Sequence, residues 1–332
     1  MSMVDQGVSR SRSRRQQVLS RFGRDRLAMA GLVSCLVLVL GAFAGPLFYR
    51  WSYRDLDRSA LSRPPGSPGH LLGTETIGRD LLALLMRGVQ RSTMIAVVFV
   101  LLAGSLGLLV GALAGYFGRF VDSVLMRLVD LILTLPTLVV LLVVANTFDS
   151  LHSALGVAVF LAAFGWLGLA RVVRAELLSL REREFVEAAQ ALGASGRRII
   201  LTHLLPNSLG AIMVWVTVGA AGSVVDESVL TYLGYGVRGN DTSLGRLVAD
   251  GVSAAETRPW LFYLPGLVLM LLVISISLIG DGIREAVHPS PGPPRPGPRV
   301  RPAIRRLRRL SRGGRRRPEP SGQWSVVPEG GG

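Results

Sequence analysis

Residues 186–207 read V-E-A-A-Q-A-L-G-A-S-G-R-R-I-I-L-T-H-L-L-P-N and lie between long apolar segments. The helix formers of Ala175–Ala191 predict a helix that ends at Gly193, because glycine readily adopts the left-handed conformation of a helix end. Ser195 is suited to cap a second, short helix, and Pro206 is expected to stop that helix. The pattern therefore predicts a helix, a glycine turn and a short helix outside the apolar segments. An ordinary connection between two helices is the alternative interpretation.

The first helix predicted for this stretch has an apolar face, formed by Phe185, Ala189 and Leu192. These positions follow the spacing of one side of an α-helix. Ala188 and Ala189 carry small side chains, which would allow the surface of another protein to approach the helix closely. The stretch is thus a candidate docking surface.

The stretch resembles the E-A-A loop of the permease subunits of ABC importers. That motif consists of E-A-A, three residues, G, nine residues, a variable position, one residue and L-P, and this sequence keeps the spacing. The matching residues are Glu187, Ala188, Ala189, Gly193, His203, Leu205 and Pro206. The resemblance implies a cytoplasmic loop whose short helices dock into a groove on an ATP-hydrolysing subunit. In that role Glu187 would pair at the partner's surface, and Gly193 would allow the bend.

The composition indicates a membrane protein. Of the 332 residues, 49% are hydrophobic, and the formal net charge of +15 is concentrated near the chain ends. The 1 cysteine, Cys35, cannot form a disulfide framework, and the 4 histidines are scattered, so no metal site is expected. All 37 basic residues are arginine. A P-loop needs a lysine that reaches the nucleotide phosphates, so the chain cannot be a P-loop ATPase by itself.

Six apolar segments are long enough to cross a bilayer, which predicts an all-α, polytopic membrane protein with six transmembrane helices. The expected spans are residues 27–48, 93–116, 124–147, 153–173, 209–233 and 260–280. Leu81–Val89 is apolar enough to lie along the membrane surface before the second span. A basic segment, 1–26, precedes the six-helix permease domain, which is expected over 27–289, and a Pro- and Arg-rich segment, 290–332, follows it.

The distribution of arginines among the connecting segments predicts the orientation of these spans. With both termini inside, the cytoplasmic segments hold more arginines than the external ones, as the positive-inside rule requires. Both termini and the 186–207 loop are therefore predicted to be cytoplasmic, although the arginines of 49–92 weaken the argument. A cleaved signal peptide is the alternative for the N-terminus, because Ser13-Arg14-Arg15 resembles a twin-arginine start. The apolar run that follows is longer than a usual signal region, which favours an uncleaved helix.

Two further blocks resemble the dipeptide and oligopeptide permease subgroup, in particular its second, C-type permease. Gly73–Asp80 is similar to the block G-T-D-x-x-G-R-D, with Glu75 in place of the usual Asp. Gly280–Pro289 is similar to the ending G-D-G-L-R-D-A-L-D-P of that family. Together the matches cover roughly residues 27–289 and leave out the Arg-rich tail.

Several charged residues fall inside the expected spans, where a charge is costly. Asp226 and Glu227 are therefore expected to face the bundle interior or water, and we interpret them as lining the translocation path or its external gate. A structural role near the outer interface is the alternative. In another span, Arg127 and Asp130 are spaced so that they can pair.

The last segment of the chain has a different character. Arg301–Arg317 places arginines around Ile304, Leu307 and Leu310, which fall on one side of a short helix. A basic segment with an apolar edge suits an anionic membrane surface. Nucleic-acid binding is not expected, because no aromatic side chain is interleaved for base stacking. A solvated, unstructured tail is the alternative.

The resemblance implies a permease subunit of an ABC importer in the bacterial cell membrane, which forms the translocation path for peptides or similar small solutes. It implies no catalytic residue and no cofactor in this chain, since ATP and Mg²⁺ would be bound by partner ATPases. The implied partners are a second permease subunit in a heterodimer, two ABC ATPase subunits, an extracytoplasmic substrate-binding protein and membrane lipids.

Two other classes of protein remain as alternatives to the importer subunit. A secondary transporter would usually show internal repeats of helices, and none is evident between the two halves of the sequence. A membrane-anchored enzyme would need a nucleophile–base or metal-binding constellation, and the sequence offers none.

Overall fold

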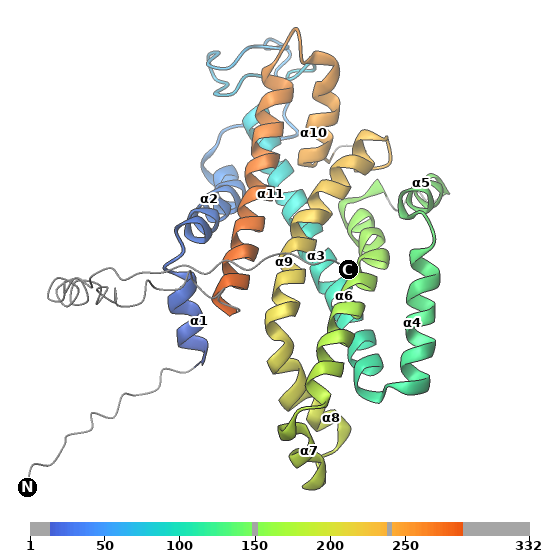
Figure 1. Cartoon of the computed structure of the whole chain (residues 1–332). Helices are drawn as coiled ribbons and strands as arrows, with labels where there is room; N and C mark the ends of the chain where they lie inside the picture. Colours follow the sequence, from blue (N-terminus) through green and yellow to red (C-terminus); the bar gives the residue numbers. More distant parts are fainter. Residues whose placement is uncertain (1–13, 148–151, 238–240, 288–332) are drawn as a thin grey trace, which may run out of the picture. The chain divides into compact units, whose positions relative to one another are not determined.

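The computed structural model describes residues 14–147, 152–237 and 241–287. These residues form a bundle of α-helices within one compact unit (Figure 1), which confirms the expected all-α fold. In chain order the helices are α1 (Arg14–Phe22), α2 (Arg26–Phe48), α3 (Leu81–Phe117), α4 (Arg119–Leu133), α5 (Thr137–Thr147), α6 (Ala154–Arg181), α7 (Glu184–Ala191), α8 (Gly196–Arg198), α9 (Leu205–Tyr232), α10 (Leu244–Gly251) and α11 (Trp260–Val287). The basic tail falls outside the described residues.

Among the described residues, 5 helical stretches are long and apolar enough to cross a membrane. They are α2, α3, α6, the continuous stretch that ends with α9, and α11. The interval 124–147, which we expected to form one span, is instead divided into α4 and α5. Pro136 explains the break, because proline has no N–H to donate to the preceding turn and is accommodated just before a new helix begins.

The prediction of a separate surface helix over Leu81–Val89 is wrong, because α3 runs without a break through 37 residues. At about 1.5 Å per residue, a helix of this length exceeds the thickness of the hydrocarbon core. The first turns of α3 are polar on one side. The guanidinium groups of Arg87 and Arg91 lie 2.8 and 2.6 Å from the carboxylate of Asp241. These turns therefore extend α3 beyond the apolar span.

Glycines allow α3 and α6 to pack closely along their length. Gly107, Gly111 and Gly115 recur every four residues on one side of α3 and face α6. A Cβ added at Gly111 would lie 2.6 Å from the backbone oxygen of Ala170, too close for any real contact. Small residues at this spacing let helix backbones approach each other in membranes, where packing drives association.

The variant Gly111→Ala is expected to destabilise the α3–α6 contact by about 1–3 kcal/mol, the usual cost of overpacking. Gly104→Ala is the matched control, since a Cβ there meets nothing within 4 Å and the gain in helix propensity is the same. Thermal melting of the detergent-purified variants, monitored by size-exclusion chromatography, checks the prediction. Equal melting temperatures for the two variants would contradict it.

The two ends of the bundle carry different structures. Residues 49–80, here called the cap, connect α2 to α3 and lie at one end, together with the connection between α10 and α11 (Figure 1). Helices α7 and α8 lie at the opposite end. The bundle thus separates two candidate interaction surfaces by the length of its spanning helices.

Candidate functional site

The helix that leads into the loop predicted over 186–207 is interrupted just before the loop begins. The single helix predicted over Ala175–Ala191 is wrong: α6 ends at Arg181, and α7 begins at Glu184 after an extended residue. The break allows α7 to fold back against the end of the bundle. There Val186, with 0% exposure, packs in a cluster of buried residues contributed also by α6.

The glycine turn of the loop is the one predicted from the sequence. Gly193 has a φ of +78°, in the left-handed region. Its N–H donates to the oxygen of Gln190 at 2.9 Å, and the N–H of Ala194 donates to the oxygen of Ala189 at 3.0 Å. These two bonds form a Schellman motif, which satisfies carbonyl groups that the end of α7 would leave without partners.

Pro206 does not stop a helix, contrary to the prediction. Residues Ile199–Leu204 form a π-helical turn, and the N–H of Leu205 donates to the oxygen of Ile200. The wider turn relieves the clash that a proline ring makes with the preceding turn of an α-helix, and the missing N–H costs little at the start of α9. Loop and span therefore form one continuous helical stretch, Gly196–Tyr232.

The motif residues of the loop lie at the surface of the bundle end. Glu187, Ala188, Gly193 and Pro206 are exposed, whereas Ala189, His203 and Leu205 are half-buried. Two residues of the apolar face predicted for α7 are exposed, Phe185 at 40% and Leu192 at 89%, whereas Ala189 packs against the buried cluster. An exposed apolar face beside an exposed carboxylate is typical of a surface that binds another protein.

Asp226 and Glu227, for which one shared role was predicted, lie in different surroundings on α9. Asp226 is exposed, and Glu227 is 0% exposed. The Oε1 atom of Glu227 accepts hydrogen bonds from Ser243 Oγ at 2.6 Å and from Thr231 Oγ1 at 2.8 Å. Ser243 is also the N-cap of α10, where its Oγ accepts from the N–H of Arg246 at 3.1 Å. Glu227 therefore fastens the start of α10 to α9.

The charges of α4 are paired with α6. Asp130 accepts from Arg171 Nη2 at 2.6 Å, so the pairing expected with Arg127 is replaced by a contact between helices. One turn further along α6, Arg174 Nη2 lies 2.6 Å from Asp122 Oδ2. Two arginines of α6 thus hold the amphipathic α4 alongside it.

The cap contains a polar cluster that no sequence motif indicated. His70 is 2% exposed, its Nδ1 atom lies 2.8 Å from Asp80 Oδ2, and its ring stacks on Trp51 at a centroid distance of 4.7 Å. The Tyr49 hydroxyl donates to the same Asp80 oxygen at 3.0 Å, and burial beside this carboxylate raises the pKa of Tyr49 to about 12. Asp80 ends the block Gly73–Asp80, so its buried contacts give that block a structural role.

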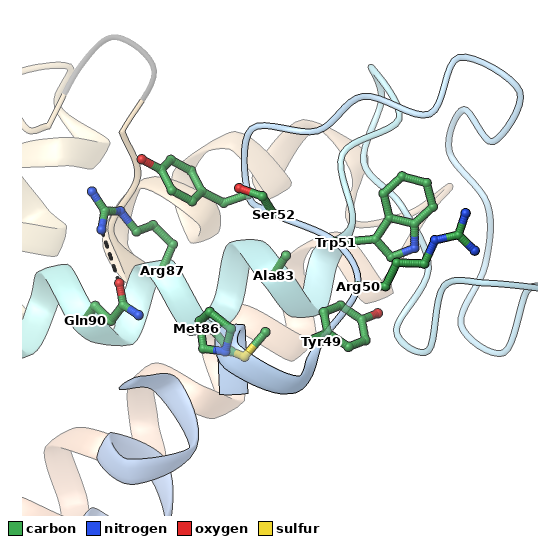
Figure 2. A pocket seen from close by; sticks show the side chains of 10 residues that line it. Tyr49, Arg50, Trp51, Ser52, Ala83, Met86, Arg87 and Gln90 are labelled. Carbon is green, nitrogen blue, oxygen red and sulfur yellow. Dashed lines mark hydrogen bonds between the residues drawn. The ribbon is translucent and has the colours of Figure 1, made fainter. Parts of the chain in front are cut away.

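A cavity of about 380 Å³ lies where α2, the cap and α3 meet (Figure 2). Figure 2 shows Met86, Arg87 and Gln90 along α3, with Arg50 and Trp51 on the cap side. The polar groups of α3 here have protein partners: Gln90 Nε2 donates to the oxygen of Ala42 at 2.7 Å, and Arg87 donates to Gln90 at 3.2 Å. The cavity is therefore part of the joint between the spans and the cap. In the described ranges, no group of three potential ligands could hold a metal ion.

The long apolar helices and the exposed loop between α6 and α9 define a polytopic membrane protein with a candidate docking surface. Comparison with known families gives the same class. Residues 107–291 match the family described as "Binding-protein-dependent transport system inner membrane component". Residues 13–65 match a second model, described as "N-terminal TM domain of oligopeptide transport permease C". The chain belongs to the family of binding-protein-dependent transport system inner membrane components.

Curated relatives support this assignment over most of the chain. The oligopeptide transport system permease protein OppC of Mycobacterium tuberculosis is 40% identical over 278 residues, which cover 84% of this chain and 95% of that protein. OppC of Haemophilus influenzae is 34% identical, over 84% of this chain and 89% of that protein. A putative peptide permease protein of Brucella suis is 37% identical, over 81% and 89%. The resemblance found in the sequence to the permease subunits of ABC importers is confirmed.

A solved structure shares the fold. A chain of the MetNI methionine ABC transporter, in an inward-facing conformation, superposes with a TM-score of 0.52 at 21% identity; the match covers 61% of this chain and 96% of that one. Members of this family are membrane components without catalytic activity, and ATP is hydrolysed in partner subunits. The chain is thus a permease subunit, and its partners include another permease, an ATPase and a binding protein.

Proposed function

We propose that this chain is the C-type permease subunit of a bacterial peptide importer, and that its 186–207 loop docks onto an ATPase subunit. The observation that carries the docking proposal is the exposed apolar face of α7, with Phe185 and Leu192 beside the exposed Glu187. Peptides are proposed as cargo because the relatives that cover most of this chain are named as oligopeptide or peptide permeases.

The continuous helix from the loop into α9 supports a coupling mechanism. ATP binding would bring two partner ATPases together, and the docked α7 and α8 would move with them. Because Gly196–Tyr232 has no flexible linker between loop and span, this motion would pass directly to the helices that alternate access. In this mechanism Ala188 and Ala189 permit close packing, and His203, Leu205 and Pro206 shape the turn into α9.

The remaining partners and the orientation complete the proposal. The chain would pair with a second permease as a heterodimer, bind two ATPase subunits that hold ATP and Mg²⁺, and receive cargo from an extracytoplasmic substrate-binding protein. Both termini and α7 would lie in the cytoplasm, with the cap outside the plasma membrane. Because the 5 long helices alone would place the termini on opposite sides, α4 and α5 together would provide the sixth crossing. The opposite positions of α7 and the cap support this orientation (Figure 1). Asp226, exposed on α9, would line the path.

The variant Glu187→Arg tests the docking surface. The chain is co-expressed with its candidate ABC ATPases, solubilised in detergent and captured by an affinity tag. We expect wild type to retain an ATPase, and Glu187→Arg to retain at least about tenfold less, because reversing an interfacial charge leaves the partner's group facing a like charge. Glu182→Arg makes the same change of charge at an exposed position just outside α7 and serves as the control.

Two results would count against the docking proposal. If wild type retains no ATPase, the importer function itself fails. If Glu187→Arg and Glu182→Arg both retain the ATPase as well as wild type does, the subunit assembles through another surface.

A further inference from the structure

A groove of about 460 Å³ lies between the last turns of α3 and the start of the stretch that leads into α9. One wall consists of apolar side chains of α3, and the other is formed mainly by the π-helical turn Ile199–Leu204. Of the described residues that line the groove, only Arg197 carries a charge. The side chains that matter most are Leu109, Leu113, Phe117, Arg197, Ile200 and Leu201.

The groove has the depth of one leaflet of a bilayer. Residues 93–117 of α3 carry no charged side chain, and Arg119 follows directly after the C-cap Gly118. The lining residues that lie farthest apart on α3, Leu108 and Phe117, are separated by about 14 Å of helix, which is half of a typical hydrocarbon core. The end at Phe117 therefore meets the membrane interface, and the other end lies near the centre of the bilayer.

The charge of the groove lies at its interfacial end. Gly196, next to Arg197 in the chain, packs directly on Tyr116 in the last turn of α3, because a Cβ at Gly196 would lie 2.7 Å from the Tyr116 ring. Arg197 is exposed at this level. The π turn then continues along the groove, away from the interface. The groove thus offers one cation at the membrane surface and hydrocarbon below it.

Two more arginines stand near the same end of α3. Arg181 Nη1 donates to the backbone oxygen of Tyr116 at 3.1 Å, and Arg119 begins α4. Both side chains are exposed, whereas Asp122 in the first turn of α4 is held by Arg174 of α6. Positive charge is therefore concentrated where the headgroup of a lipid in the groove would lie.

The chemistry of the lining favours a lipid over a protein as the occupant. A protein surface brings many polar groups, and protein interfaces carry hydrogen bonds throughout their area. Along this groove, by contrast, the described lining side chains offer a partner for one polar group alone, at Arg197. A phospholipid matches this arrangement, because it joins a long apolar chain to one charged phosphate. The guanidinium group of arginine is well suited to bind such a phosphate.

We propose that this groove binds one anionic phospholipid of the inner leaflet, with an acyl chain along Leu109, Leu113 and Leu201 and its phosphate at Arg197. The inference rests on the proposed function, because that function places α8, opposite the cap, at the cytoplasmic face (Figure 1). The cytoplasmic leaflet is the anionic one. Since the groove joins α3 to the turn between the docking loop and α9, the bound lipid would contact both sides of the proposed coupling element.

The test purifies the chain in mild detergent together with its co-expressed partner subunits. Phosphatidylglycerol is titrated, and bound lipid is measured by native mass spectrometry. We expect Arg197→Gln to bind the tightest lipid at least about fivefold more weakly, because its phosphate loses a charged partner. Leu109→Trp is expected to weaken binding as well, since the larger side chain fills the groove from α3 while Arg197 stays in place.

Each variant has a matched control. Arg198→Gln removes the same charge at the next residue, which is exposed and is not among the lining residues. Leu101→Trp makes the same enlargement on α3 about two turns before the groove, at a side chain that is 62% exposed, compared with 58% for Leu109. Both controls should bind phosphatidylglycerol as wild type does. Phosphatidylcholine with the same acyl chains should bind wild type at least about fivefold more weakly than phosphatidylglycerol.

Three results would overturn the inference. Equal affinity of wild type and Arg197→Gln would show that the headgroup is not held there. Equal affinity for phosphatidylglycerol and phosphatidylcholine would show that the site does not recognise an anionic headgroup. Loss of the co-purified second permease from Leu109→Trp, with lipid binding unchanged, would assign the groove to that protein.

Retention of the ATPase, measured on the same wild-type samples, separates this inference from the proposed function. If the ATPase is retained and the lipid results fail, the importer function stands and the inference on the groove falls. If the lipid binds as expected but no ATPase is retained, the importer function falls and the lipid site stands.

Discussion

Gly193→Pro is expected to abolish retention of the ATPase while leaving the chain inserted in the membrane. Proline fixes φ near −65°, and Gly193 has a φ of +78°, so the turn after α7 cannot form. Proline also lacks the N–H that Gly193 donates to the oxygen of Gln190. The loss should exceed the effect of Glu187→Arg, because it displaces the whole of α7 rather than one charge. Co-purification of the ATPase with the tagged chain measures it.

Gly193→Asn is the matched control for this prediction. Asparagine tolerates the left-handed conformation better than other side chains do, and a Cβ at Gly193 would meet nothing within 4 Å. This variant should retain most of the ATPase. If Gly193→Pro retains as much ATPase as Gly193→Asn, the geometry of the turn has no part in docking.

Glu227→Ala is expected to release α10 from α9 and to stop uptake. The substitution removes the acceptor for the hydroxyls of Ser243 and Thr231 and leaves a cavity, at a cost of about 2–4 kcal/mol. Ala254 lies just after α10 and is 4% exposed. In a Cys35→Ser background, the variant Ala254→Cys carries a single cysteine that reports the movement of α10. Its maleimide labelling should become about tenfold faster when Glu227 is replaced.

Two variants accompany this measurement. Ser243→Ala should give part of the same increase in labelling, because it removes one of the two hydrogen bonds to Glu227. Asp226→Asn should leave labelling unchanged, since Asp226 is exposed on α9, and should reduce uptake if this side chain lines the path. Unchanged labelling and uptake in Glu227→Ala would show that the link between α9 and α10 is dispensable.

The sequence predicted the parts of the fold that depend on local patterns. Five of the six expected spans, the helix end at Gly193 and the family follow from periodicity, from the conformational freedom of glycine and from a spaced motif. The sequence failed where a local rule was overridden. A proline that should have ended a helix at Pro206 is absorbed by the π turn before it, and α6 and α7 separate although the residues between them are good helix formers.

The sequence located the candidate residues along the chain but did not predict their surroundings. Exposure of Phe185 and Leu192 depends on how α7 folds back, which no local pattern encodes. The separation of Asp226 from Glu227 follows from packing against α10, far along the chain. The cap cluster was missed for the same reason: His70 meets Asp57 and Asp80 only because glycine turns bring them together.

In the proposed coupling mechanism, the continuous helical stretch Gly196–Tyr232 would act as a lever arm. Its 37 residues extend about 55 Å, so a tilt of only about 5° at the α8 end would displace the Tyr232 end by about 5 Å. That displacement is about as large as the spacing between neighbouring helical turns, and it would occur near the end of α9 where Glu227 binds the start of α10. In the proposed mechanism, a small rotation imposed on α8 would thus be magnified at the far end of the stretch into a movement that can open or close a passage.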